Sequence, residues 1–101
     1  MDGTNAGRHN ERDLVCKHAV YSGRVQGVGF RYAVQELAAD FDINGYVRNL
    51  PEGTVEVLAE GPADDVEEFL TAIERRMAGY IHDKSIQDAP SPGRKGFQIR
   101  Y

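Results

Sequence analysis

The chain has 101 residues, of which 41% are hydrophobic and 28% are charged, a composition typical of one globular domain rather than of a disordered chain. Its net charge of −4 argues against nucleic acid or an anionic membrane as the main partner, and no apolar run approaches the roughly 18 residues of a membrane span. Cys16 is the only cysteine, which excludes an intramolecular disulfide and any Cys-x-x-Cys motif, and because the N-terminus has no hydrophobic stretch we expect a cytoplasmic protein.

The first half of the chain predicts an extension, a strand, a glycine-rich turn and a helix. Residues 1–13 hold almost nothing apolar and predict a flexible extension, which leaves 14–101 as the folded domain. Leu14–Ser22 is rich in strand formers. Gly23–Gly29 has three glycines in seven residues, too many for the interior of a strand or helix. Phe30–Asp40 carries apolar residues on one face at helical spacing.

The second half predicts a hairpin, a longer helix and two short strands. Ile43–Asn49 and Thr54–Glu60 should form an antiparallel hairpin, because residues 50–53 have the proline and glycine positions of a tight turn. Pro62–Ala78 is the clearest helix, with apolar residues at helical spacing, acidic residues near its start and basic residues near its end. Two further strands are expected at Ile81–Gln87 and Phe97–Tyr101.

The order β-α-β-β-α-β, with a short extra C-terminal strand, predicts an α+β fold. Such a chain folds most economically as a ferredoxin-like sandwich, in which two helices pack on one face of an antiparallel sheet. The first strand, the first helix and the next strand form a βαβ unit, so these two strands run parallel and end at the same edge of the sheet. The glycine-rich turn and Asn49 should therefore meet at that edge, where ligands of α/β units bind.

The glycine-rich turn has features of an anion-binding site. Glycines allow backbone N–H groups to converge on a small anion, and the following helix adds the positive end of its dipole. The turn matches neither the Walker A pattern nor the dinucleotide fingerprint, so on pattern alone a purely structural turn is an equal alternative. Arg31 favours the anion, because a cation in the first helical turn is unfavourable unless an oxyanion lies beside it. A plain surface arginine is the alternative, but a guanidinium can hold two phosphate oxygens at once.

Asn49 has two interpretations. Asparagine commonly precedes a turn, and Leu50-Pro51 begins one. Alternatively, its side-chain amide holds a water molecule in line with a bound phosphorus.

The other chemically active residues indicate no second site. Cys16 is expected to be an ordinary strand residue. Arg24 and Arg48 either add positive potential near the predicted pocket or are plain surface charges. No metal-ligand spacing connects the three histidines, His9, His18 and His82. We therefore expect no metal site among these residues.

Three motifs carry a resemblance to the acylphosphatase family. They are Gly-Arg-Val-Gln-Gly-Val-Gly-Phe-Arg at 23–31, Gly-Tyr-Val-Arg-Asn at 45–49 and Gly-Thr-Val-Glu at 53–56, and the ending at 97–101 is also similar. The likeness runs from about Leu14 to Tyr101 in the right order and at the right spacing. It is specific, because the first motif is a long uninterrupted match.

The resemblance implies a ferredoxin-like fold and the hydrolysis of acyl phosphates to a carboxylate and inorganic phosphate, without metal or cofactor. It implies that Arg31 binds the phosphate and that Asn49 orients the attacking water. Backbone N–H groups would form the phosphate cradle at Val25, Gln26, Gly27, Val28, Gly29 and Phe30. Tyr46 stands where many members have tryptophan, which we expect to alter packing near the site rather than chemistry.

The expected partners follow from that activity. They are a small acyl phosphate as substrate and inorganic phosphate as product and inhibitor. No nucleic acid and no membrane is expected, and the size and polar composition fit a monomer.

Three other functions fit part of the sequence. An RNA-binding module of the same fold needs aromatics on its central strands and a basic face, whereas Thr54–Glu60 has no aromatic residue and two glutamates. Acylphosphatase-like domains also begin large hydrogenase-maturation proteins that process carbamoyl phosphate, but the end at Tyr101 favours a free-standing enzyme. A phosphate- or carbamoyl-phosphate-binding module with little turnover has no need for Asn49.

Overall fold

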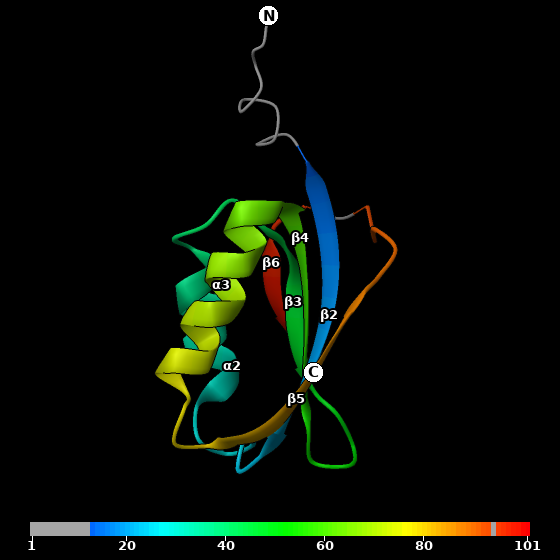
Figure 1. Ribbon diagram of the computed structural model, residues 1–101. Coiled ribbons are helices and arrows are strands. Elements are labelled where there is room, and N and C mark those ends of the chain that lie inside the picture. The colour runs from blue at the N-terminus through cyan, green and yellow to red at the C-terminus, as the bar shows by residue number, and fades with distance from the viewer. Residues whose placement is uncertain (1–12, 94) are drawn as a thin grey trace, which may run out of the picture.

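The computed structural model describes residues 13–93 and 95–101 as two helices packed on one face of a five-stranded sheet (Figure 1). In chain order the elements are β2 (Leu14–Gly23), α2 (Phe30–Ala38), β3 (Asn44–Asn49), β4 (Val55–Pro62), α3 (Ala63–Arg76), β5 (Ile81–Asp88) and β6 (Phe97–Arg100). The predicted extension at 1–13 lies outside the described residues apart from Asp13, whose backbone carbonyl accepts a hydrogen bond from the N–H of Ala63 at 2.9 Å. None of the helices described is long and apolar enough to cross a membrane.

The strand order across the sheet is β5-β2-β4-β3-β6, which confirms the ferredoxin-like fold. β4 lies between β2 and β3 and is antiparallel to both, so β2 and β3 run parallel and end at one edge, as predicted. β6 pairs in parallel with β3, so the sheet is mixed rather than wholly antiparallel. The reason is that the C-terminal end of β5 lies at the same end of the sheet as the start of β3. A strand that follows β5 from there and pairs beside β3 therefore runs in the direction of β3 (Figure 1).

Both helices end earlier than the periodicity predicts. The first pattern extends to Asp40, but α2 ends at Ala38, and the N–H groups of the next two residues bond to carbonyls only three residues back. Such bonds tighten the last turn and satisfy carbonyls that the helix leaves unpaired. α3 likewise ends at Arg76 rather than at Ala78. These shifts leave the helix starts, and therefore the site, where the sequence predicts them.

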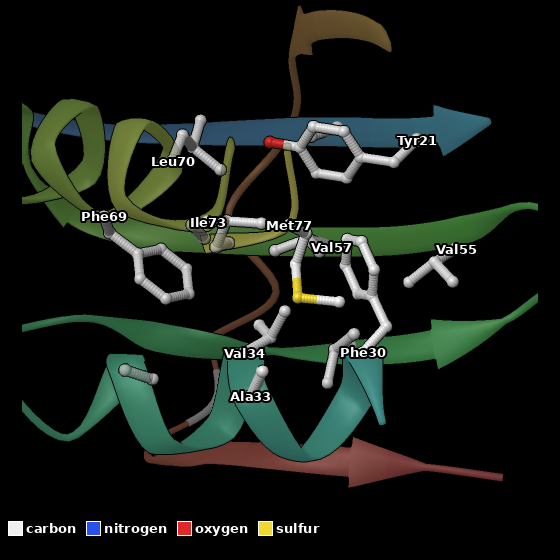
Figure 2. Packing of buried hydrophobic residues seen from close by; sticks show 14 of the residues in the cluster. Tyr21, Phe30, Ala33, Val34, Val55, Val57, Phe69, Leu70, Ile73 and Met77 are labelled. Atoms are coloured by element: carbon white, nitrogen blue, oxygen red, sulfur yellow. The ribbon is translucent and has the colours of Figure 1, made fainter. Parts of the chain in front are cut away.

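The core between the helices and the sheet fixes where α2 begins. Phe30, the first residue of α2, is 2% exposed, and its ring centroid lies 5.8 Å from that of Tyr21 on β2 (Figure 2). Burying such a side chain contributes about 1.5–3 kcal/mol. Phe69 of α3 packs edge-on against Phe97, with centroids 5.4 Å apart, and this contact holds β6 on the core. Large buried side chains therefore anchor both the start of α2 and the strand β6.

Gly45 of β3 lies directly against the backbone of β4. Its φ is +146°, and an added Cβ would lie 1.8 Å from the backbone oxygen of Leu58. A side chain at this position would collide with the backbone of the neighbouring strand. The glycine that opens the motif at 45–49 therefore has a structural role and is required for the pairing that carries Asn49.

Candidate active site

A small cleft of about 180 Å³ opens where the glycine-rich turn, the start of α2 and the end of β3 meet. It is lined by Val25, Gly27, Gly29, Phe30, Arg31, Tyr32 and Asn49. The cleft brings together Arg31 and Asn49, as the parallel direction of β2 and β3 predicts. A larger hollow of about 480 Å³ lies between α3 and the β2–β5 edge, but none of the predicted site residues lines it.

The glycine-rich turn adopts backbone angles that favour glycine. Gly27 and Gly29 have φ values of +77° and +80°, and a Cβ on either would meet no atom within 4 Å. Conformation rather than crowding therefore requires glycine here, since the left-handed region costs other L-residues roughly 1–2 kcal/mol. Turns that include such residues are those in which successive N–H groups form an anion-binding concavity.

The start of α2 offers unpaired donors to the cleft. Gly29 caps the helix without a side-chain hydrogen bond, and the first turn contains no acidic residue. The first bond within the helix runs from the N–H of Ala33 to the carbonyl of Gly29 at 3.0 Å. The N–H groups of Phe30, Arg31 and Tyr32 therefore have no acceptor within the helix, and none elsewhere in the part of the chain described. The positive end of the helix is open to an anion.

The Arg31 side chain stacks on an aromatic ring of the chain's C-terminal segment and has no counter-charge among the described residues. It is half-buried, and its guanidinium carbon lies 4.8 Å from the centre of the Tyr101 ring. The Tyr101 hydroxyl in turn lies 3.4 Å from that of Tyr32, which also lines the cleft. Among the described residues, no carboxylate side chain lies within ion-pair distance of Arg31. Its positive charge is therefore free to pair with a bound anion.

The Asn49 amide is not used by the turn that follows it. Backbone bonds close that turn, from the N–H of Gly53 to the carbonyl of Leu50 at 3.0 Å and from the N–H of Leu50 to the carbonyl of Thr54 at 2.9 Å. Strand alternation places Asn49 on the same face as the fully buried Val47, toward the helices. Within the described residues the Asn49 side chain makes no hydrogen bond to protein, which favours a role toward a ligand over a role in the turn.

Two residues of the predicted cradle do not line the cleft. Val28 packs partly buried against the core. Gln26 instead directs its side-chain Nε2 to the carbonyl oxygens of Leu50 and Thr54, at 2.8 and 2.9 Å. Sequence reasoning assigned Gln26 a backbone role and missed this bridge. The only signal was a polar residue with two amide donors within a turn that otherwise consists of glycine, valine and Arg24.

A second polar cluster lies on the opposite face of the sheet. Glu56 is 8% exposed and contacts His18 through Oε2 at 2.6 Å. Its Oε1 accepts a hydrogen bond from Nε of Arg48 at 3.0 Å and forms an ion pair with Nη2 of the same side chain at 2.8 Å. Tyr46 lies on the same open face, with its ring centre 4.0 Å from the guanidinium carbon of Arg100. Arg48 and Tyr46 are therefore separated from the cleft by the sheet, and the expected influence of Tyr46 on packing near the site is not seen.

The remaining candidates do not join the cleft. Cys16 is buried, and burial, with a smaller contribution from Glu60, raises the pKa of its thiol, as fits an unreactive strand residue. His82 is exposed on β5, and His9 lies outside the described residues. Arg24 is exposed and does not line the cleft. Across the described ranges, no group of three or more His, Cys, Asp or Glu residues is placed to hold a metal.

Glu56→Gln is expected to lower stability in a pH-dependent way. Burial raises the pKa of Glu56, but the hydrogen bonds from His18 and Arg48 and the charge of Arg48 outweigh burial, so the net pKa is lowered. A lowered pKa stabilises the fold above the unfolded value of about 4.3, and this stabilisation is lost as pH falls through the folded value. At about pH 7 the variant should lose about 1 kcal/mol, which corresponds to a melting temperature lower by about 4–8 °C.

Thermal unfolding from about pH 7 to about pH 3 measures the difference in melting temperature between Glu56→Gln and the wild type, which should become smaller as the pH falls. Glu67→Gln, at an exposed position on α3, is the matched control and should follow the wild type throughout. A difference that stays constant over the whole range would contradict the role of the Glu56 charge.

Comparison with known proteins finds relatives that match most of the domain. The family model described as Acylphosphatase matches residues 17–99. An acylphosphatase from Methanospirillum hungatei is 47% identical over 83 residues, which cover 80% of this chain and 91% of that protein. The crystal structure of acylphosphatase from Bacillus subtilis is similar with a TM-score of 0.77 at 36% identity, covering 88% of this chain and 100% of that chain.

A longer protein contains a segment of the same fold. The crystal structure of HypF from T. kodakarensis is similar with a TM-score of 0.72 at 26% identity. The match covers 88% of this chain but 12% of that chain. The likeness is therefore to one segment of a much larger protein.

Proposed function

This chain belongs to the acylphosphatase family, and we propose that it hydrolyses a small acyl phosphate by direct attack of water on phosphorus. The observation that carries the mechanism is the cleft itself. In it lie a helix start without a side-chain cap, the arginine Arg31 and the amide of Asn49, which makes no hydrogen bond to any described residue. Each of these groups suits one part of the reaction.

Phosphate binding falls to Arg31 and the backbone. The phosphate of the substrate is a dianion, and the open N–H groups at the start of α2, together with the cradle at Val25–Phe30, offer donors to it. The Arg31 guanidinium forms two parallel hydrogen bonds to phosphate oxygens and adds a full positive charge. In the transition state, negative charge is spread over the equatorial oxygens, so these same donors stabilise it.

Water positioning falls to Asn49. Its amide oxygen accepts a hydrogen bond from the attacking water, which places the water in line with the bond that breaks. The water oxygen bonds to phosphorus, the carboxylate leaves with the electron pair, and the water proton passes to the phosphate or to solvent. Because a carboxylate is a weak base, no strong general acid is needed. Among the described residues that line the cleft, Arg31 and Tyr32 are the titratable ones.

The alternative is a module that binds phosphate or carbamoyl phosphate with little turnover. The similarity to one segment of HypF is the observation that favours it. A phosphate binder has no use for a side-chain amide in the cleft that makes no hydrogen bond to the described residues, so the Asn49 geometry favours hydrolysis. Inhibition by phosphate, a monomeric state and a cytoplasmic location stay predictions from the sequence.

Hydrolysis of benzoyl phosphate in ¹⁸O-labelled water with EDTA tests the proposal. We expect turnover that EDTA does not reduce, with the label in the phosphate, because the water attacks phosphorus. Carbamoyl phosphate, assayed in parallel, distinguishes a broad acyl phosphatase from a specialised one. Label in benzoate would place the attack at the acyl carbon and reject the mechanism. A folded protein that binds phosphate without any turnover would leave the binding module as the better description.

A further inference from the structure

We propose that the side chain of Gln26 is a positioning residue, which locks the phosphate cradle to the turn that carries Asn49. The inference rests on the proposed function, because it assigns Asn49 the water and the cradle the phosphate. It adds a contact that couples the two, so that the water and the phosphorus are held at a fixed separation.

The geometry of the bridge is specific. The Gln26 amide nitrogen has two hydrogens, and two carbonyl oxygens lie within hydrogen-bond distance of it: Leu50 at 2.8 Å and Thr54 at 2.9 Å. Leu50 directly follows Asn49 in the chain, and Thr54 directly precedes Val55, the cross-strand partner of Asn49. One side chain therefore donates to both strands of the hairpin, next to Asn49.

The turn does not need this bridge to close. Leu50 already accepts from the N–H of Gly53, and Thr54 already accepts from the N–H of Leu50. Each carbonyl has two lone pairs, so the Gln26 amide takes the second acceptor site on each oxygen. Among the described residues, these are the only hydrogen bonds that join the glycine-rich turn to the 50–54 turn. The bridge thus adds nothing to the turn itself and ties it to the cradle.

The expected consequence is kinetic. Without the bridge, water can satisfy both carbonyls because Gln26 is only half-buried, and the two turns can then shift relative to each other. A displacement of about 1 Å in a reacting group can cost about 100-fold in rate. Phosphate binding should change much less, because Arg31 and the helix start belong to α2 and do not depend on the bridge.

Gln26→Met is the test, since methionine has similar length and no donor. We expect kcat for benzoyl phosphate to fall about 10- to 100-fold, and the inhibition constant of inorganic phosphate to change less than about threefold. Gln35→Met, on the exposed face of α2, is the matched control and should keep wild-type kinetics. Gln26→Ala is the second variant, in case methionine is not accommodated. Wild-type kcat in a folded Gln26 variant, or a phosphate constant weakened as much as kcat, would overturn the proposal.

A double-mutant cycle with Asn49→Ala separates this proposal from the proposed function. If Gln26 acts through Asn49, then adding Gln26→Met to Asn49→Ala should lower the residual kcat by less than about twofold. If Gln26→Met lowers kcat by the same factor in the wild type and in Asn49→Ala, the coupling is overturned and the function of Asn49 stays intact. Undiminished turnover in Asn49→Ala alone would instead overturn the role of Asn49, and the coupling with it.

Discussion

Replacing Asn49 with Ala is expected to lower kcat for acyl phosphate hydrolysis by about 100- to 1,000-fold, with the inhibition constant of phosphate changed less than about threefold. The reason is that the amide acts on the water, whereas the anion is held by Arg31 and by backbone N–H groups that the substitution does not touch. Steady-state kinetics with benzoyl phosphate, combined with phosphate inhibition, measure both quantities on one sample. Because the Asn49 side chain makes no hydrogen bond within the described residues, the fold should tolerate the change.

The matched control is Asn44→Ala, the same substitution at the other end of the same strand. There the side-chain oxygen accepts a hydrogen bond from the N–H of Gly96 at 2.8 Å, so the control changes a structural contact and should keep kcat. Equal losses of turnover and of phosphate affinity in Asn49→Ala would show that this residue maintains the shape of the cleft rather than the position of a water molecule.

Replacing Arg31 with Gln is expected to weaken both phosphate binding and turnover. Each hydrogen bond from a charged donor contributes about 1.5–3 kcal/mol, so losing the bidentate contact should weaken phosphate binding about 10- to 100-fold or more. The fall in kcat/KM should be larger, about 1,000-fold, since the charge on the equatorial oxygens grows toward the transition state. Arg31→Lys should recover only part of this, because it restores the charge without the planar fork.

Arg24→Gln is the control for charge alone, as it removes a positive charge from the start of the same turn without touching the cleft lining. We expect both the inhibition constant of phosphate and kcat/KM to change by no more than about threefold, because charges at an exposed site are screened. The Arg31 variants also lose the stacking on Tyr101, which at an exposed site contributes about 0.5–1 kcal/mol to stability. Thermal unfolding measures this loss. Phosphate inhibition that is unaltered in Arg31→Gln would remove this arginine from the anion site.

Local patterns account for much of the fold. The apolar spacing of α3 predicts its buried residues Val66, Phe69, Leu70 and Ile73, and the structure buries all four. The meeting of the glycine-rich turn with Asn49 was predictable because a βαβ unit fixes the relative direction of two strands without any knowledge of their neighbours. The parallel pairing of β6 was not predictable, since a strand of four residues carries no pattern that specifies its partner.

Contacts between distant segments explain what the sequence did not reveal. Leu58 interrupts the alternation of β4, and the structure shows why: β4 is buried on both faces, and Leu58 is only 6% exposed. The Gln26 bridge and the His18–Glu56–Arg48 cluster join residues that are far apart in the chain, so no local spacing indicates them. Tyr46 and Asn49 are three positions apart in β3, so strand alternation alone places their side chains on opposite faces of the sheet.

The insertion of β4 between β2 and β3 links the chemistry to the folding pathway. The helix start that carries Arg31 follows β2, and Asn49 ends β3, yet these two strands touch only through β4, which comes later in the chain. A nascent or partly folded chain that has formed only the β2–α2–β3 unit therefore lacks a sheet to set the separation of the two residues. Pairings between such distant segments form late and make folding slow relative to helical bundles. We therefore expect enzymatic activity to require the complete central sheet, so that a chain in which β4 has not yet paired with β2 and β3 should be inactive.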